Sequence, residues 1–274
     1  MLVYTVCFTK KDQEPKDNKY IFMLLMWLKF IEVFGCIQTT DRICIIVDTK
    51  TKDYLESINI LPSFYTCMEV EQPQTIQEGT QFRYRIYESG LIQEDTVVCY
   101  LDVDMLVIKD IHWIQENIQS APNSLQVYPE YTMRHFSYLG ELTQEDMVFF
   151  EEFPECYTNH PGMSSTIFGF QGRLLQEPFG ELLKAMRGST VINYTLDQPF
   201  FNRMVLSHCY KKQTFEISFL HKSCIAYNEL RHRCAEDAKV INFCGEPGNQ
   251  DFHWIKMYMA VLAEVTSKTQ SHLQ

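Results

Sequence analysis

The sequence predicts an α/β protein with one open, mixed but mostly parallel central sheet flanked by helices. The first 104 residues alternate apolar, strand-like runs with helix-like segments, which is the βαβ order of a parallel sheet. The 274 residues are 46% hydrophobic and 22% charged, which is enough to bury one large core. No internal repeat or low-complexity tract divides the chain. We therefore expect a single domain over residues 1–274.

Each expected strand is a short run rich in β-branched and other apolar residues, such as "LVYTVCF" and "RICIIVD". Such runs are typical of strands that are buried on both faces of a sheet. We expect strands over residues 2–8, 42–48, 64–70 and 96–104. Helices are expected between them, over residues 20–34, 51–58 and 79–91.

The longest apolar stretch runs from Tyr20 to Phe34, "YIFMLLMWLKFIEVF". It carries Lys29 and Glu32 and falls short of the roughly 18 to 20 residues that a membrane span requires. We interpret it as a core helix and expect no transmembrane segment. The first residues contain neither an apolar run long enough for a secretion signal nor a small-residue cleavage site.

Ten cysteines are present, and none lies in a CxxC motif. Cys7, Cys44 and Cys99 fall inside apolar, strand-like runs, where cysteine acts as a small hydrophobic residue. We therefore expect a reducing, cytoplasmic location and no structural zinc.

The second half of the chain changes in composition. Residues 130–162 are aromatic, acidic and irregular, and we interpret them as an insertion or lid between sheet elements. Strand character resumes at residues 165–171. Helices are then expected over residues 173–187 and 196–208.

The chain is acidic, with a formal net charge of −11 and a pI near 5.2. This charge opposes contact with nucleic acid or anionic lipid. A phosphate-bearing ligand would need a cation or a few well-placed basic side chains. Neither GxGxxG nor GxxxxGK[ST], the usual phosphate-binding loops of α/β sheets, occurs in the sequence.

Two aspartates, Asp102 and Asp104, end the strand-like run "TVVCYLDVD". If extended geometry persists, both point to the same face at the carboxyl end of the strand, where α/β sheets bind ligands. Two close carboxylates repel each other unless a cation lies between them, and such hard oxygen ligands select Mg²⁺ or Mn²⁺. The pair therefore predicts a divalent-cation site. A cap for a strand end or a turn is the alternative.

Further motifs give this pair a context. In chain order they are "YLDVDMLVIKDI", "MSSTIFGFQ", "LDQ", "IAYNEL" and "VINFCGEPGNQ". Together they resemble the landmarks of the glycogenin-like glycosyltransferases of family 8. The resemblance implies the GT-A fold, a Rossmann-like fold of nucleotide-diphospho-sugar transferases, with residues 1–110 as the nucleotide-binding half. Residues 111–274 would form the acceptor half, which carries the insertion.

The resemblance also implies roles for individual residues. The metal, Mn²⁺ or Mg²⁺, would be held by Asp102, Asp104 and Asn242. The donor would be bound by Arg83, Asp102, Val103, Asp104, Ser164, Ser165 and Gly245. The catalytic residues beside the donor sugar would be Asp197 and Gln198.

Two of these residues have a plainer interpretation. Arg83 lies in a segment that we expect to be helical, beside Arg85, and either arginine could be a solvated surface charge. Asp197 precedes Pro199 and an apolar helix, which is typical of a helix N-cap.

The chain also departs from the family pattern. Ser164, Ser165 and Thr166 stand where the family usually has Asn-Ser-Gly. Asn242 stands where a histidine completes the metal site, and the phosphate-facing lysine of the late motif has no evident counterpart. These departures bear on activity, metal preference and donor affinity.

We expect a retaining glycosyltransferase that moves a hexose from a nucleotide sugar, with a UDP-sugar favoured, to a glycan or protein acceptor. A non-catalytic module that binds a sugar nucleotide or glycan is the main alternative. A haloacid-dehalogenase-type phosphatase is disfavoured, because its Asp-x-Asp motif is normally followed by Thr or Val where this chain has Leu106. We expect no nucleic-acid partner. A homodimer is possible.

Overall fold

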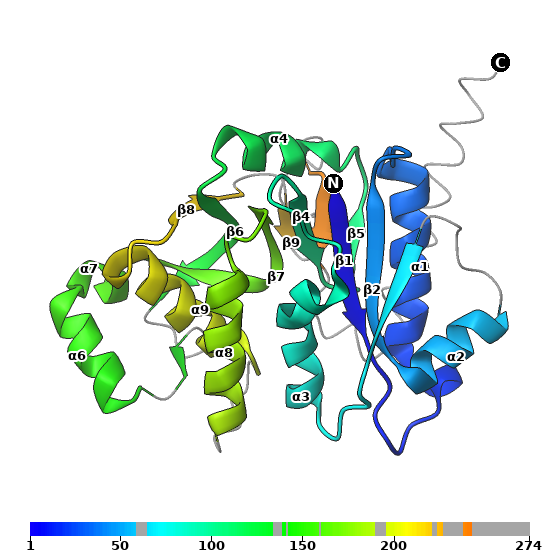
Figure 1. Cartoon of the computed structure of the whole chain (residues 1–274), viewed down its shortest axis with the longest axis horizontal. Coiled ribbons are helices and arrows are strands. Elements are labelled where there is room, and N and C mark those ends of the chain that lie inside the picture. The colour runs from blue at the N-terminus through cyan, green and yellow to red at the C-terminus, as the bar shows by residue number, and fades with distance from the viewer. Residues whose placement is uncertain are drawn as a thin grey trace.

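A seven-stranded sheet, in the order β3-β2-β1-β4-β7-β6-β8, runs through the centre of the protein (Figure 1). The computed structural model describes residues 1–58, 65–133, 139–140, 142–158, 160–189, 196–220, 224–226 and 238–242. Strand β7 is antiparallel to its neighbours β4 and β6, and the other neighbouring strands are parallel. The expected mixed, mostly parallel sheet is therefore confirmed.

The strands of this sheet are β1 (Leu2–Cys7), β2 (Arg42–Asp48), β3 (Tyr65–Val70), β4 (Val97–Leu101), β6 (Ser124–Thr132), β7 (Pro161–Gln171) and β8 (Glu216–Phe219). A second sheet has the order β5-β10-β9 and consists of β5 (Met105–Val107), β10 (Val240–Asn242) and β9 (Cys224–Ala226).

The α-helices of the described residues are α1 (Lys19–Phe34), α2 (Thr49–Ile58), α3 (Ile76–Gln81), α4 (His112–Ser120), α6 (Gln144–Glu152), α7 (Pro154–Thr158), α8 (Gln176–Gly188) and α9 (Gln198–Leu206). Two 3₁₀ helices, η1 (Pro15–Asp17) and η2 (Phe82–Ser89), and one π-helical turn, η3 (Ser207–Lys211), complete the described helical elements.

Side chains alternate between two faces of the sheet, and each face has its own hydrophobic core. On β4, Val98 and Tyr100 join the core under η2, α8 and α9, whereas Cys99 and Leu101 join the core under α1 and α4. Because both faces are covered, the strands read as continuous apolar runs in the sequence.

The segment expected to be one helix over residues 79–91 is divided. Helix α3 ends at Gln81, and the 3₁₀ helix η2 follows it up to Gly90, which has a φ of 69°. In a 3₁₀ helix, side chains three residues apart align. This spacing directs Arg83 and Ile86 together into the protein, where both are buried.

The segment expected to be an irregular insertion is partly helical. Its described residues include α6, α7 and the adjoining ends of β6 and β7. Helix α6 begins with a capping box in which Thr143 and Asp146 bond each other's backbone N–H groups, and this capping favours a regular helix. Residues 134–138, 141 and 159 lie outside the described residues.

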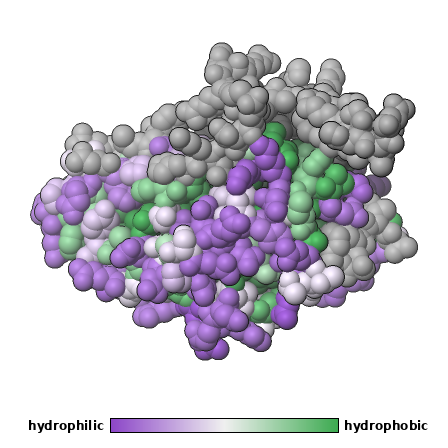
Figure 2. Space-filling model, turned by 90° about the horizontal axis from the view of Figure 1, so that it is seen from above, coloured by the Kyte–Doolittle hydropathy of each residue, from purple (hydrophilic) through white to green (hydrophobic). Residues whose placement is uncertain are grey.

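The molecule shows a mainly hydrophilic surface when it is seen from above, with smaller hydrophobic areas between (Figure 2). No helix in the described part of the chain is long and apolar enough for a membrane span. Among the described side chains, the free thiols are those of Cys7, Cys36, Cys44, Cys67, Cys99, Cys156 and Cys209.

Candidate donor site at the end of strand β4

The candidate site lies where β4 ends beside β7. The backbone N–H of Asp102 still donates to Thr166 O of β7 at 2.9 Å, but the chain then turns, and Met105 N–H donates to Asp102 O at 3.1 Å. Residues 102–105 therefore form a turn that leads from β4 into β5. The expectation that the strand continues to Asp104 is wrong, because the chain changes sheets at this point.

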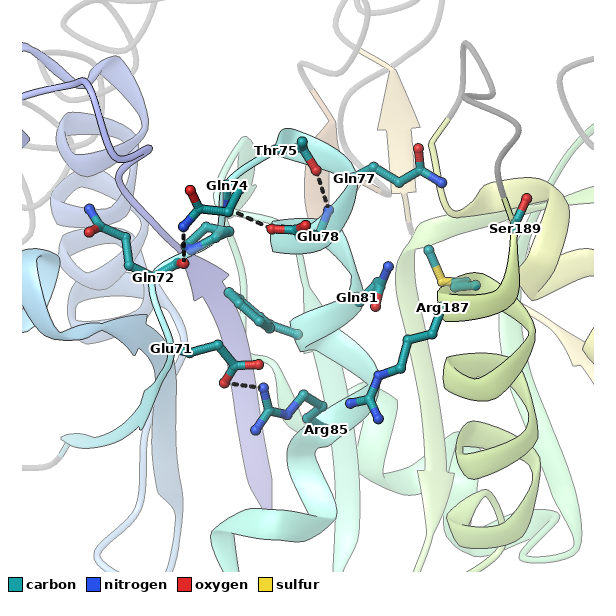
Figure 3. A pocket seen from close by; sticks show the side chains of 13 residues that line it. Glu71, Gln72, Gln74, Thr75, Gln77, Glu78, Gln81, Arg85, Arg187 and Ser189 are labelled. Carbon is teal, nitrogen blue, oxygen red and sulfur yellow. Dashed lines mark hydrogen bonds and ion pairs between the residues drawn. The ribbon is translucent and has the colours of Figure 1, made fainter.

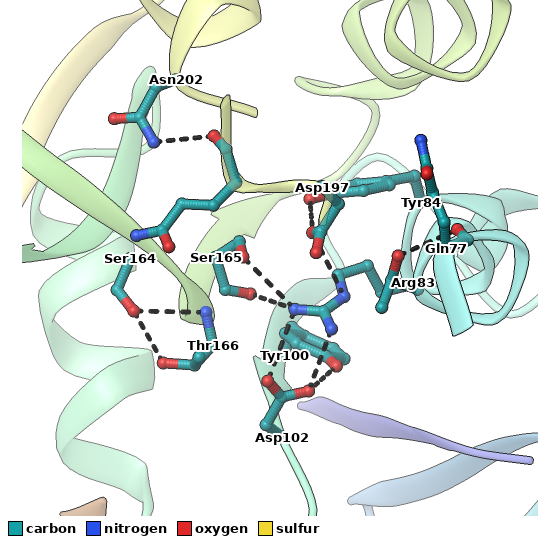
Figure 4. A network of polar contacts seen from close by, with 12 residues as sticks. Gln77, Arg83, Tyr84, Tyr100, Asp102, Ser164, Ser165, Thr166, Asp197 and Asn202 are labelled. Carbon is teal, nitrogen blue, oxygen red and sulfur yellow. Dashed lines mark hydrogen bonds and ion pairs between the residues drawn. The ribbon is translucent and has the colours of Figure 1, made fainter. Parts of the chain in front are cut away.

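Arg83 lies at the centre of a buried polar cluster (Figure 4) and is only 7% exposed. Its guanidinium reaches Asp102 through Nη1 and Nη2, both at 3.4 Å. Its Nε lies 3.5 Å from Asp197 Oδ2, an ion-pair distance without hydrogen-bond geometry. One arginine thus joins two aspartates that are far apart in the sequence.

The two carboxylates explain why an arginine is tolerated here. Burial alone would lower the pKa of Arg83, but Asp102 and Asp197 raise it well above its usual value. Arg83 therefore stays charged and neutralises part of the acidic cluster. Its interpretation as a solvated helix charge is wrong. Arg85 is the less buried of the two arginines and pairs with the exposed carboxylates of Glu71 and Glu88.

Two tyrosines also donate hydrogen bonds to these carboxylates. Tyr100 donates its hydroxyl hydrogen to Asp102, and Tyr84 donates its own to Asp197. Both rings are buried, and burial raises the pKa of each phenol well above 10, so each remains a donor. Sequence analysis did not single out either residue. The available signals were the position of Tyr84 next to Arg83 and of Tyr100 two residues before Asp102.

Asp197 occupies the N-cap position of α9 but does not cap the helix. Its backbone is in the helical region, and its side chain makes no capping hydrogen bond. The preceding residue, Leu196, has a φ of 55°, a conformation that costs energy for a residue other than glycine. The N-cap interpretation is wrong, because the carboxylate is directed toward Tyr84 and Arg83 instead.

The strand β7 supplies the remaining side of the cluster. Arg83 Nη1 donates to Ser165 O at 2.8 Å and lies 3.4 Å from Ser165 Oγ. Ser164 is also buried, and its hydroxyl is 2.8 Å from Thr166 Oγ1. The structure thus brings Ser165 into the Arg83 cluster, while Ser164 bonds along its own strand.

Gln198 and Asn202 attach α9 to β7. Gln198 Nε2 donates to Met163 O at 3.2 Å. Asn202 is fully buried, accepts from Met163 N–H at 2.9 Å and donates to Met163 O at 2.8 Å. Sequence analysis did not single out Asn202. The available signal was its position one helical turn after Gln198 in an otherwise apolar helix.

Asp104 has the donor chemistry of a cation ligand. Its Oδ1 is buried and has no hydrogen-bond partner among the described residues. Burial, and then the nearby Asp102 charge, raise the pKa of Asp104 to about 7. Burial likewise raises the pKa of Asp102. A divalent cation would compensate for both effects, so the two carboxylates fit Mg²⁺ or Mn²⁺.

The third expected ligand lies next to this turn. Asn242 is paired with Met105, the residue after Asp104, and is 7% exposed. The described residues contain no group of three or more His, Cys, Asp or Glu side chains that could hold a metal. Val103 packs its side chain in the core under α1, which leaves only its backbone for a donor. Gly245 lies outside the described residues.

The mixed, mostly parallel sheet with flanking helices is that of the GT-A fold, the fold that the resemblance implied. Two solved structures share it. Mouse xyloside xylosyltransferase 1, in its apo form, is 10% identical with a TM-score of 0.58, and the match covers 90% of this chain and 99% of that chain. The galactosyltransferase LgtC, solved with donor and acceptor sugar analogs, is 12% identical with a TM-score of 0.60, and 96% of each chain is covered.

No protein-family model matches the chain, and no curated protein matches its sequence. The similarity therefore lies in the fold.

Proposed function

We propose that this chain is a retaining glycosyltransferase that moves a hexose from a nucleoside-diphosphate sugar, with a UDP-sugar favoured, to a glycan or protein acceptor. The observation that carries the proposal is the contact of Arg83 with both Asp102 and Asp197 in a GT-A fold. This contact places the Asp-x-Asp turn beside the Asp-Gln pair. These are the two motifs that the family resemblance assigns to the donor.

The proposed metal would be held by Asp102 and Asp104, with Asn242 as a further candidate ligand. When bound, Mn²⁺ or Mg²⁺ would supply positive charge for the diphosphate that leaves. The unpartnered Oδ1 of Asp104 supports this role. An asparagine offers a neutral oxygen in place of an imidazole, so we expect weak metal binding in the absence of nucleotide.

The remaining residues would hold the site in shape. Arg83 fixes the spacing between Asp102 and Asp197. Asp197 would face the hydroxyl groups of the donor sugar, and Gln198 would lie beside it at the N-terminus of α9. Arg83 already donates hydrogen bonds to Asp102 and Ser165 and lies at ion-pair distance from Asp197. We therefore propose that it orients the acidic groups and does not act mainly as a phosphate ligand.

The decisive experiment is a screen of purified protein against UDP-sugars and GDP-sugars with Mn²⁺, which records thermal stabilisation and donor hydrolysis. Asp102→Asn and Asp104→Asn should each abolish metal-dependent hydrolysis, because they keep the shape and remove the charge. The matched control is Asp95→Asn, since Asp95 is an exposed aspartate before the opposite end of β4. Full hydrolysis in both site variants would refute the metal role.

A binding module without catalysis is the second candidate. It is favoured by the fact that Arg83 and Tyr100 already neutralise and bond Asp102. Calorimetric titration of Mn²⁺ into UDP-bound protein separates the two ideas when the wild type is compared with Asn242→His. A tighter Mn²⁺ site together with new turnover in the variant would favour a binding module in the wild type. No gain in affinity would mean that Asn242 does not face the ion.

We also propose a reducing, cytoplasmic location. The support is the position of Cys7, Cys44 and Cys99, whose thiols are buried inside strands β1, β2 and β4.

A further inference from the structure

A cavity of about 640 Å³ lies between the α3–η2 segment and the end of α8 (Figure 3). This volume is in the range of small-molecule sites. Of the residues that line it, Gln77 is also drawn with the Arg83 cluster in Figure 4, whereas Arg83, Asp102 and Asp197 do not line the cavity. The cavity thus adjoins the proposed donor site, which does not explain the rest of its lining.

The cavity and the donor site share η2 as a supporting segment. Phe82 and Arg85 line the cavity, while Arg83 and Tyr84, between them in sequence, are buried in the polar cluster. The opposite wall ends at Ser189, which follows α8. A ligand in this cavity would therefore lie beside the donor site.

The largest group of lining side chains both donates and accepts hydrogen bonds. Four of the 13 lining residues are glutamines: Gln72, Gln74, Gln77 and Gln81. The apolar ones are Pro73, Phe82 and Met186, of which the last two are buried. Paired amide donors and acceptors suit the hydroxyl groups of a sugar, and the apolar surface between them suits its C–H faces.

The charges at the cavity compensate one another. Arg85 binds Glu71 at 2.5 Å and Glu88 at 2.6 Å. The hydrogen bond from Arg85 lowers the pKa of Glu71 although burial opposes it, and the Arg187 charge lowers it further. Glu78 accepts the backbone N–H of Gln74 at 2.6 Å. The lining contains two arginines and two glutamates, so it carries no net positive charge for an anionic ligand.

Two polar side chains remain available for a ligand. Neither the Gln81 amide nor the Arg187 guanidinium has a hydrogen-bond partner among the described residues. They come from opposite walls of the cavity (Figure 3). A ligand that bonds both would bridge α3 and α8.

We infer that this cavity binds a neutral oligosaccharide, namely the part of a glycan acceptor that extends away from the transferred sugar. Only the assignment of this ligand as the acceptor rests on the proposed function. The binding of an uncharged sugar is inferred from the lining itself. It narrows the proposed acceptor from a glycan or protein to a neutral glycan.

The test is saturation-transfer NMR on the full chain without donor or metal. The probes are maltotriose, cellotriose and xylotriose, with trigalacturonic acid as the anionic comparator. At least one neutral trisaccharide should bind, and Gln81→Ala and Arg187→Ala should each weaken it about fivefold, as expected for the loss of one hydrogen bond. Folding of each variant is checked by circular dichroism.

Matched controls lie at the other end of α8. Gln176 and Arg173 are exposed and do not line the cavity, so Gln176→Ala and Arg173→Ala should leave saccharide binding unchanged. The inference is overturned if no neutral trisaccharide binds, if trigalacturonic acid binds more tightly, or if the control variants lose affinity equally. Failure of donor hydrolysis would refute the proposed enzyme and leave the binding result intact.

Discussion

Tyr84 donates a hydrogen bond to Asp197 across 113 residues of sequence. Tyr100 makes the equivalent bond to Asp102, and Arg83 lies between the two carboxylates. Each aspartate thus has one phenol donor and a share of one guanidinium. This arrangement holds two buried acids in fixed positions, and several consequences can be measured.

Tyr84→Phe should lower the kcat of donor hydrolysis about tenfold, roughly 1.4 kcal/mol of barrier, with little change in KM. The substitution keeps the aromatic packing against Phe179 and Phe201 and removes only the hydroxyl donor to Asp197. Steady-state kinetics and urea denaturation are to be measured on the same samples.

The control for this variant is Tyr87→Phe. Tyr87 bonds backbone groups of Gly172 and Leu175 at 3.1 Å, away from the carboxylates. It should lose about 1 kcal/mol of stability and keep its kcat. If Tyr84→Phe changes stability alone, Tyr84 has only a structural role.

Arg83→Leu should destabilise the protein by about 3 to 5 kcal/mol, because it leaves two buried carboxylates without their cation. Arg85→Leu should cost only about 1 kcal/mol or less, since its carboxylate partners are exposed. The free energy of unfolding in urea gives both values. Similar costs for the two arginines would show that the Arg83 bridge is not a buried ion-pair network.

Asp104→Asn should stabilise the metal-free protein more at pH 8 than at pH 5. The pKa of Asp104 is about 7 in the folded protein and about 3.9 when unfolded. At a pH between these two pKa values, the protein takes up a proton when it folds. The free energy of unfolding of the wild type therefore falls as the pH rises toward 7, and it falls no further above pH 7. Each 1 kcal/mol of difference corresponds to about 2 to 4 °C in Tm.

The measurement is a pair of thermal melts in EDTA at the two pH values, followed by melts with Mn²⁺. The ion should stabilise the wild type more than Asp104→Asn at pH 8. A constant difference between the two proteins at both pH values would mean that Asp104 titrates as an ordinary surface aspartate.

Asn202→Ala should cost about 2 to 3 kcal/mol, because it leaves the buried N–H and C=O of Met163 without that side-chain partner. The same substitution at Asn117, which is exposed on α4, should change stability by less than about 0.5 kcal/mol. Urea denaturation compares them. Equal, small effects would show that the link between α9 and β7 does not depend on Asn202.

Local sequence was sufficient for the parallel strands β1 to β4 and for the place of the acidic pair. Strands β1, β2 and β4 were predictable because both of their faces are buried, and this burial requires continuous apolar runs. Asp102 and Asp104 marked the end of β4 because charge is costly inside such a run. The helical segments α1 and α8 followed from length and apolar content.

Tertiary structure alone decided how the acidic residues are used. Asp197 has a good N-cap sequence, yet its carboxylate bonds Tyr84 and approaches Arg83, since a buried charge gains more from these partners than from a helix end. The turn after Asp102 depends on β5 pairing with β10, far along the chain. The partners of a buried polar group come from distant segments, so the sequence determined which residues carry charge, and packing determined which charges meet.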